Sequence, residues 1–155
     1  MQTQFKQNDL HTGDPGNNPN SIFPPAALFN LDLLIRKMEA YAGKKSFLVF
    51  KHNKYFTVPT ESIAFFYVKY EASIIVCFDR QEYLVSNSLE QIGNLVTGRQ
   101  FFRVNRQYLV NFAAVKEVEH YFARKLLVNL TVPSPDKLLV PKDKSALFLQ
   151  WLENR

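Results

Sequence analysis

The sequence contains a single cysteine, Cys77, among its 155 residues. One thiol cannot form an internal disulfide or a multi-thiolate metal site, and the apolar neighbours of Cys77 predict a small buried hydrophobic residue. Histidine is also scarce, and none of the three has a second His, Cys or carboxylate at the spacing of a metal-ligand pair. We therefore expect no metal site in this chain.

Glycine is equally rare. The five glycines provide no Gly-rich phosphate loop, and the sequence has no G-x-S-x-G motif. Cys77 lies in an apolar run, which is the wrong environment for a reactive thiolate. The composition predicts a protein that is not an enzyme, has no cofactor and shows no evident small-molecule ligand.

Long hydrophobic runs are absent as well. No apolar run approaches the roughly 18 to 20 residues that cross a bilayer, and residues 1–16 are polar without a signal core. These features predict a soluble, cytoplasmic protein without membrane contact. Aromatic residues, by contrast, make up 14% of the chain, with 14 Phe and 7 Tyr, which favours strand-rich packing over disorder.

The composition changes along the chain. Residues 1–27 are rich in Asn, Gln, Gly and Pro and predict a disordered tail or linker. Residues 28–43 carry apolar side chains at helical spacing and end at a glycine, which predicts one amphipathic helix. Its apolar stripe packs either on its own domain, the more common arrangement, or on a second copy. Residues 46–153 are expected to form the main domain.

Short apolar and aromatic runs follow, and they predict antiparallel strands because the turns between them are too short for parallel crossovers. Two helices interrupt them: one after Ser88, with Gln91 completing a capping box, and one over Asp143–Glu153 with Asp143 as its N-cap. The predicted fold class is mainly β, with antiparallel strands in small packed sheets, short helices and a preceding N-terminal helix. The expected strands are Ser46–Lys51, Tyr55–Val58, Ile63–Tyr70, Ser73–Phe78, Glu82–Val85, Val115–Phe122, Leu126–Val132 and Leu138–Val140.

Positive charge is concentrated in the main domain. Residues 1–43 hold three basic and four acidic side chains, whereas residues 44–155 hold sixteen basic and ten acidic ones, for a net charge of +5 overall. Such an excess favours an anionic partner. The stretch 91–116 contains no acidic residue but four basic ones, Arg99, Arg103, Arg106 and Lys116.

The most informative segment is Phe101–Asn111, with the sequence FFRVNRQYLVN. Its apolar positions can anchor it in the core, while Arg103, Asn105 and Arg106 offer the donors and amides that pair with base edges or phosphates of DNA. Arg103 and Asn105 equally fit a structural role at a strand end, and Asn111 is the more structural residue of the segment.

This segment resembles the signature of the LytTR family of bacterial DNA-binding domains, the output modules of many two-component response regulators. The resemblance covers about residues 46–153 and implies a mostly antiparallel β fold whose connecting loops read DNA. Where many members have Ser-Arg, this chain has Pro141-Lys142, and a lysine offers only a point charge. The other similar stretches are Ile63–Phe66, Ser88–Ile92, Val140–Lys142 and Leu147–Leu152.

The resemblance implies three places of DNA contact. The outer two also fit plainly structural roles, as solvated residues at a strand end or at a helix start. The implied DNA-binding residues are Lys69 and Tyr70 after an aromatic strand, Arg103, Asn105 and Arg106 in the central segment, and Lys142 and Lys144 after the last strand.

Together these features predict a sequence-specific DNA-binding transcriptional regulator, the output module of a two-component phosphorelay. Its expected partner is double-stranded DNA with repeated half-sites, bound by two copies as a homodimer on DNA. The sequence holds no receiver domain, so the chain is expected to be either a stand-alone regulator or an excised output domain. Two other classes stay open: a protein-interaction module built on the aromatic strands and first helix, and an RNA-binding domain whose aromatic side chains stack on bases.

Overall fold

The computed structural model describes residues 25–154, and the side chains of residues 30–38 and 43–154. Residues 1–24 of the predicted tail lie outside the described residues. The chain divides into two units, residues 1–40 and residues 41–155. Within the part that the structure describes, no helix is long and apolar enough to cross a membrane.

The first helix that the structure describes, α2 (Pro25–Ala42), covers all but the last residue of the helix predicted over residues 28–43. Proline is favoured at a first helical position, because its missing N–H would have no partner there. An ion pair between Asp32 and Arg36 (3.0 Å) supports the polar face one turn apart. The opposite stripe is solvent-exposed and comprises Leu31, Leu34, Ile35 and Met38.

A glycine marks the start of the main domain. Gly43 has φ of +79°, and a Cβ at this position would lie 2.7 Å from the backbone nitrogen of Thr97. Both the left-handed backbone and the close approach require glycine. The next residues are bonded into the domain, because the backbone N–H of Lys44 donates to the carbonyl of Leu95 (2.7 Å).

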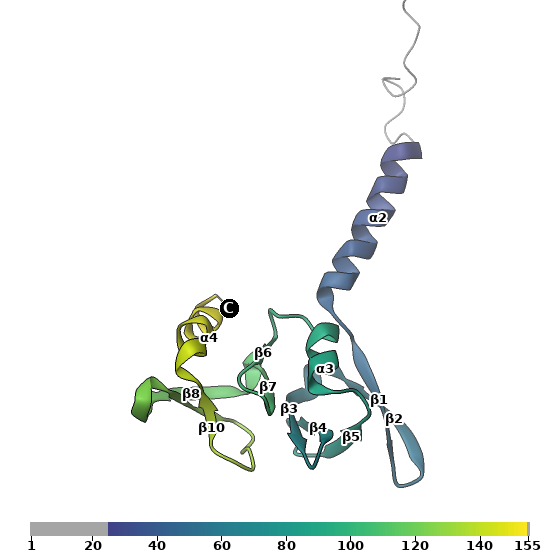
Figure 1. Cartoon of the computed structure of the whole chain (residues 1–155). Coiled ribbons are helices and arrows are strands. Elements are labelled where there is room, and N and C mark those ends of the chain that lie inside the picture. Colours follow the sequence, from purple (N-terminus) through teal and green to yellow (C-terminus); the bar gives the residue numbers. More distant parts are fainter. Residues whose placement is uncertain (1–24, 155) are drawn as a thin grey trace, which may run out of the picture. The chain divides into compact units, whose positions relative to one another are not determined.

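The main domain consists of short antiparallel strands and two helices (Figure 1). The helices are α3 (Leu89–Leu95) and α4 (Lys142–Glu153), and 3-10 turns occur at η3 (Thr60–Ser62), η4 (Phe112–Ala114) and η5 (Phe122–Arg124). The strands are β1 (Ser46–Lys51), β2 (Lys54–Pro59), β3 (Ile63–Lys69), β4 (Ala72–Cys77), β5 (Glu82–Val85), β6 (Phe101–Arg103), β7 (Tyr108–Asn111), β8 (Val115–His120), β9 (Leu126–Leu130) and β10 (Leu138–Val140).

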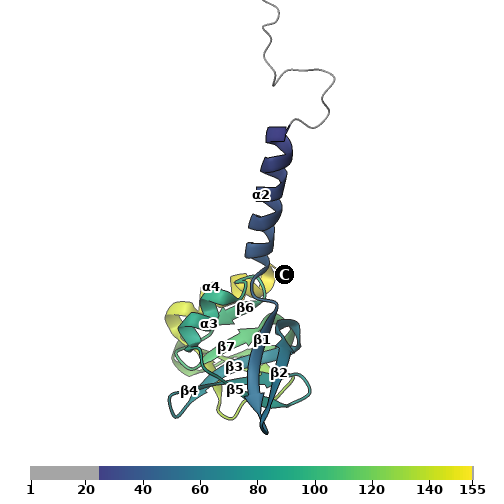
Figure 2. The same cartoon turned by 90° about the vertical axis from the view of Figure 1, so that its right-hand side faces the viewer.

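The strands form three sheets. A five-stranded sheet has the order β5-β4-β3-β7-β6, a three-stranded sheet has the order β10-β9-β8, and β1 and β2 pair as a hairpin. All pairs are antiparallel, as the short turns predict. Figure 2 shows the β1–β2 hairpin lying across the strands of the five-stranded sheet.

Strand β3 is buried on both faces and separates two hydrophobic clusters. Phe65 and Tyr67 pack with β7, the three-stranded sheet and α4, whereas Ile63 and Phe66 pack with α3 and the β1–β2 hairpin. Figure 1 shows these groups on opposite sides of β3 and β7. The continuous apolar run of β3 is thus explained by burial on both faces of the sheet.

Several sequence predictions need correction. The segment Phe101–Asn111 contains two strands, β6 and β7, that were not predicted separately. Helix α4 begins at Lys142, with Pro141 at the N-cap, so Asp143 lies in the first turn and is not the cap. Proline fits here because its N–H is not needed, and its φ is −62°.

Other local predictions are confirmed. Ser88 caps α3 through its hydroxyl, which accepts from the backbone N–H of Gln91 (3.1 Å), and the Gln91 side chain accepts from the N–H of Ser88 (2.9 Å). In α4, Phe148 and Trp151 are buried, whereas Leu147 of the predicted apolar stripe is 58% exposed. The predicted capping box of α3 is therefore confirmed. The buried face of α4 is narrower than predicted.

Candidate nucleic-acid interface

The turn between β6 and β7 carries the centre of the predicted site. Val104 is fully buried, and its backbone N–H donates to the carbonyl of Tyr108 (3.0 Å). Asn105 Oδ1 accepts from the backbone N–H groups of Gln107 (2.8 Å) and Tyr108 (3.0 Å). An asparagine that bonds to the backbone two and three residues ahead fixes a turn in one conformation.

Arg103 bonds to the same turn. Its Nε donates to the carbonyl of Asn105 (2.8 Å) and its Nη2 donates to the carbonyl of Arg106 (2.7 Å). Burial lowers the pKa of Arg103, although a guanidinium remains charged at any physiological pH. The sequence left open whether Arg103 has a structural role. Its side-chain hydrogen bonds hold the backbone of the turn, which is such a role.

Arg106 and Gln107 lie at the exposed tip of this turn. Their side chains form no hydrogen bond or ion pair with any residue that the structure describes. The complete donor fork of Arg106 and the amide of Gln107 face solvent. These two side-chain types pair with guanine and adenine, respectively, in a major groove.

Two contacts fasten the turn to the last strand and the last helix. Asn105 Nδ2 donates to the carbonyl of Leu139 in β10 (3.0 Å), and Lys144 Nζ in α4 donates to the carbonyl of Arg103 (3.3 Å). Lys142, two residues earlier at the start of α4, is exposed. The second and third predicted groups are therefore adjacent, with Asn105 and Lys144 joining them.

The turn between β3 and β4 lies beside the β6–β7 turn. Tyr70 and Glu71 have φ of 51° and 62°, which makes a tight two-residue hairpin turn. Tyr70 is 90% exposed, and Lys69 Nζ lies 5.4 Å from its ring centroid. The N–H of Val68 donates to the carbonyl of Gln107 (3.0 Å), so the structure brings the first and second predicted groups together.

A buried pair of tyrosines, Tyr67 and Tyr108, lies next to the β3–β4 and β6–β7 turns. The rings of Tyr67 and Tyr108 stack with centroids 5.7 Å apart, and Tyr108 OH donates to Asp136 Oδ2 (3.2 Å). Burial, followed by the nearby Asp136 carboxylate, raises the pKa of Tyr108. A pocket of about 380 Å³ opens here between the β3–β4 turn, Gln107 and the loop containing Pro135. The Tyr108–Asp136 contact was not predicted, because the two residues are 28 positions apart along the chain.

The cations of the main domain are not neutralised by carboxylates. Among the described residues, the only ion pair is that within α2, and no Lys or Arg of residues 43–154 takes part in one. Lys69, Arg106 and Lys142 are all exposed. Their charges are therefore available to an anionic partner.

One basic residue beside this surface was missed by the sequence analysis. Arg124 is exposed in η5, and its carbonyl accepts from Ser145 Oγ of α4 (3.4 Å). The predicted strand ran through residue 122, which concealed the turn. The adjacent basic pair Arg124-Lys125 was the available signal.

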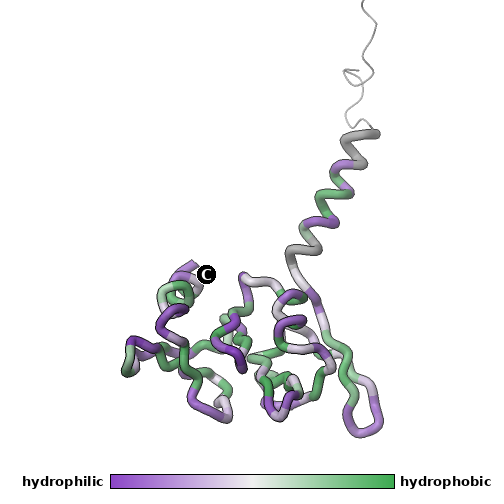
Figure 3. Tube along the Cα trace, viewed as in Figure 1, coloured by the Kyte–Doolittle hydropathy of each residue, from purple (hydrophilic) through white to green (hydrophobic). Residues whose placement is uncertain are grey.

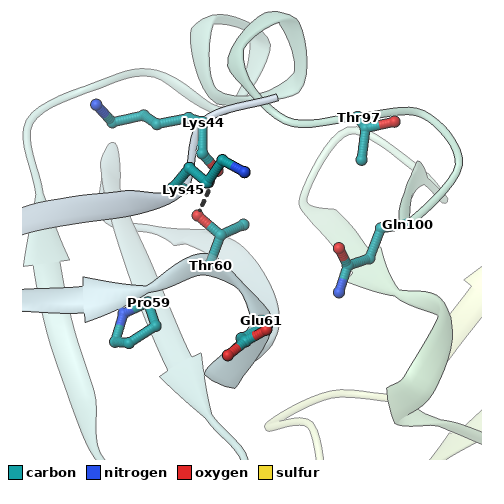
Figure 4. A pocket seen from close by; sticks show the side chains of 7 residues that line it. All are labelled: Lys44, Lys45, Pro59, Thr60, Glu61, Thr97 and Gln100. Atoms are coloured by element: carbon teal, nitrogen blue, oxygen red, sulfur yellow. Dashed lines mark hydrogen bonds between the residues drawn. The ribbon is translucent and has the colours of Figure 1, made fainter. Parts of the chain in front are cut away.

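A second pocket, of about 290 Å³, is lined by a different set of residues, which Figure 4 draws. It is lined by Glu61, by the hydroxyl of Thr60, which donates to the carbonyl of Lys44 (2.6 Å), and by Gln100. Lys44 Nζ is turned toward the ring of Phe47, 5.6 Å from its centroid. None of the predicted site residues lines this pocket.

Cys77 is buried, as predicted, and burial followed by the charge of Asp79 raises the pKa of its thiol. That direction opposes thiolate formation. Within residues 25–154 no three His, Cys, Asp or Glu side chains form a group that could hold a metal ion.

Comparison with known proteins links this arrangement to one family. Residues 53–153 match the family model described as the LytTr DNA-binding domain. The fold is similar to that of a solved LytTr DNA-binding domain from Bacillus cereus, described as part of a methyl-accepting/DNA response regulator. The TM-score is 0.61 and the sequence identity 16%, over 71% of this chain and 98% of that chain. A comparison with curated proteins finds no match. The predicted mainly β fold is thereby confirmed.

Proposed function

Because the chain belongs to the LytTr DNA-binding domain family, we propose that it is a sequence-specific DNA-binding transcriptional regulator. The observation that carries this proposal is the β6–β7 turn. Its backbone is bonded to Arg103 and Asn105, and its tip presents the unpaired guanidinium of Arg106. A fixed turn with a free donor fork is suited to reading a base edge.

The proposal divides the predicted residues by role. Arg106 contacts a base, Tyr70 contacts the DNA at the neighbouring turn, and Lys69 and Lys142 neutralise phosphates. The remaining three act through the backbone that they hold. These positioning residues are Arg103, Asn105 and Lys144.

The wider biological setting is part of the same proposal. The regulator acts in the cytoplasm as an output module of a two-component phosphorelay, and two copies occupy repeated half-sites as a homodimer on DNA. Repeated half-sites place two copies side by side on one duplex, which raises their effective concentration. Native mass spectrometry with duplexes that hold one or two half-sites measures the stoichiometry, and one copy on the two-site duplex would contradict this part.

The proposed function is tested with the Arg106→Ala variant. The wild-type chain first enriches duplexes from a random pool, and fluorescence anisotropy then measures affinity at several salt concentrations. The loss of one base contact should weaken binding of the enriched duplex by about 10-fold or more. Arg99→Ala is the matched control, because Arg99 is exposed in the same acid-free stretch but lies outside the three predicted groups.

Two results would contradict the proposal. Failure of the wild-type chain to enrich any duplex would remove DNA as the partner. Equal affinities of the folded Arg106→Ala and Arg99→Ala variants would remove Arg106 as the base-reading residue.

One observation favours the alternative of a protein-interaction module. Leu48, Phe50, Tyr55 and Leu84 are between 52% and 71% exposed and line a pocket of about 440 Å³ beside the β1–β2 hairpin. Figure 3 shows the hydrophobic residues along this hairpin and the hydrophilic turn at its tip. Titration with duplex DNA and with single-stranded RNA separates the three classes. Binding of neither nucleic acid would favour the interaction module.

A further inference from the structure

The turn between β8 and β9 has a left-handed backbone at two consecutive non-glycine residues, as the β3–β4 turn does. Ala123 and Arg124 both have φ of 60°, and the N–H of Lys125 donates to the carbonyl of Phe122 (3.3 Å). Turns of this kind normally use Asn and Gly, because a Cβ disfavours the left-handed conformation. Sterically disfavoured turns often mark functional positions. Here the turn leaves the Phe122 side chain 68% exposed.

Two aromatic rings and three cations lie close together at this turn. The rings of Tyr121 and Phe122 lie 4.8 Å apart, and Lys125 Nζ is 5.5 Å from the Phe122 centroid. Lys137 Nζ is 5.4 Å from the Tyr121 centroid and donates to its hydroxyl (3.2 Å). Arg124 is exposed, and its side chain has no partner in the described part of the chain. The Phe122 ring is suited to pack against a sugar of a nucleic-acid backbone. The three cations around it are suited to bind the adjoining phosphates.

Hydrogen bonds connect this turn to the proposed DNA-binding residues in a continuous series. The β3–β4 hairpin bonds to the β6–β7 turn through Val68, and the β6–β7 turn bonds to α4 through Lys144. Helix α4 contacts the β8–β9 turn through Ser145 Oγ, whose single hydrogen is shared between the carbonyls of Pro141 (3.0 Å) and Arg124 (3.4 Å). Figure 1 shows the β8–β9 turn beside the first turn of α4. The exposed cations of the series are Lys69, Arg106, Lys142 and Arg124.

We propose that the β8–β9 turn is a further DNA-contacting element, placed at the end of this series. Arg124 and Lys125 bind phosphates, and Phe122 packs against the adjoining deoxyribose. The inference rests on the proposed function, since it extends the same duplex along the domain. Contacts of this kind carry no sequence information and should therefore strengthen all duplexes alike.

The test compares two variants with matched controls on two duplexes. Arg124→Ala is paired with Arg80→Ala, because Arg80 is also exposed and also has a positive φ (73°). Phe122→Ala is paired with Tyr55→Ala, because Tyr55 is 71% exposed on a different hairpin. The probes are a duplex enriched by the wild-type chain and a duplex of shuffled sequence, measured between about 50 and 200 mM salt. Urea midpoints confirm that each variant is folded.

Each substitution has its own expected signature. Arg124→Ala should weaken both duplexes by about 10-fold and reduce the slope of log affinity against log salt by about 1, because one phosphate contact is lost. Phe122→Ala should weaken both by about fivefold with an unchanged slope, because apolar contact area is lost. Phe122→Leu should retain most of the affinity.

The outcomes separate this inference from the proposed function. If Arg124→Ala and Phe122→Ala match their controls while Arg106→Ala loses affinity, the β8–β9 turn does not contact DNA and the proposed function stands. If the wild-type chain binds no duplex, both fall. If polyglutamate displaces the duplex as well as unlabelled duplex does, the turn is a general polyanion surface and its assignment to DNA is overturned.

Discussion

Removal of the Asn105 side chain tests the central claim about the β6–β7 turn. The Asn105→Ala variant loses three hydrogen bonds: two that Oδ1 accepts, from the N–H groups of Gln107 and Tyr108, and one that Nδ2 donates to the carbonyl of Leu139. The bonds to Tyr108 and Leu139 are partly buried, whereas the N–H of Gln107 can turn to water. Each sheltered bond contributes about 1 kcal/mol net, and the groups left unsatisfied add to the cost. We expect the free energy of unfolding to fall by about 2 to 3 kcal/mol.

Urea unfolding measures this loss, and amide hydrogen exchange locates it. The amide protons of Gln107 and Tyr108 should exchange faster in Asn105→Ala even where the rest of the sheet stays protected. Asn129→Ala is the matched control. Asn129 Nδ2 donates only to the exposed carboxylates of Glu117 (2.9 Å) and Glu119 (2.6 Å), so its loss should change stability by less than about 0.5 kcal/mol.

A specific result would refute the reasoning. If Asn105→Ala kept wild-type stability and amide protection but lost affinity for duplex DNA, Asn105 would contact DNA directly. Asn105→Asp adds a second check, because it keeps both accepted bonds but replaces the donor to Leu139 with an acceptor. This variant should be destabilised less than Asn105→Ala if the turn bonds dominate.

Three further outcomes are expected. Because burial and Asp136 raise the pKa of Tyr108 above its usual value near 10, the stability it contributes should be complete below about pH 10 and be lost as the pH rises further; urea titrations should show a shallower alkaline decline for Tyr108→Phe. Ala123→Gly should raise the free energy of unfolding by about 0.5 to 1 kcal/mol, seen as a higher urea midpoint, because glycine adopts φ of 60° without a Cβ clash. Ser88→Ala should lower it by about 1 kcal/mol in the same assay, because the bond to the N–H of Gln91 is lost.

Strands were predicted correctly from the sequence where apolar runs are bounded by turn residues. The bounds of β1, β5 and β10 agree with the predicted ones. Strands β6 and β7 were not predicted separately, because the side chains of the motif suggested contacts to a partner rather than a hairpin. The N-cap of α4 is Pro141 and not the predicted Asp143. A proline fits this position because it has no backbone N–H that would need a hydrogen-bond partner.

The sequence predicted which residues lie at the candidate site. It did not predict which of them hold the backbone of the turn and which are exposed to a partner. Sequence placed Arg103, Asn105 and Arg106 in one group of DNA contacts. The structure directs the first two side chains to backbone carbonyls and amides and leaves the third exposed. The destination of a long side chain depends on the path of its own turn and on segments distant in sequence, such as β10. The exposed Arg124 was missed because the strand predicted through residue 122 concealed the turn that begins after His120.

The β6–β7 turn also suggests how the binding preference of such a domain could be changed. Its conformation is held by Arg103 and Asn105, together with Lys144 from outside the turn. Under the proposed function, substitutions at Arg106 and Gln107 therefore alter the side chains offered to a base without altering the backbone that presents them. A combinatorial library restricted to these two positions should yield mostly folded proteins, and new target sequences could then be selected without first repairing stability.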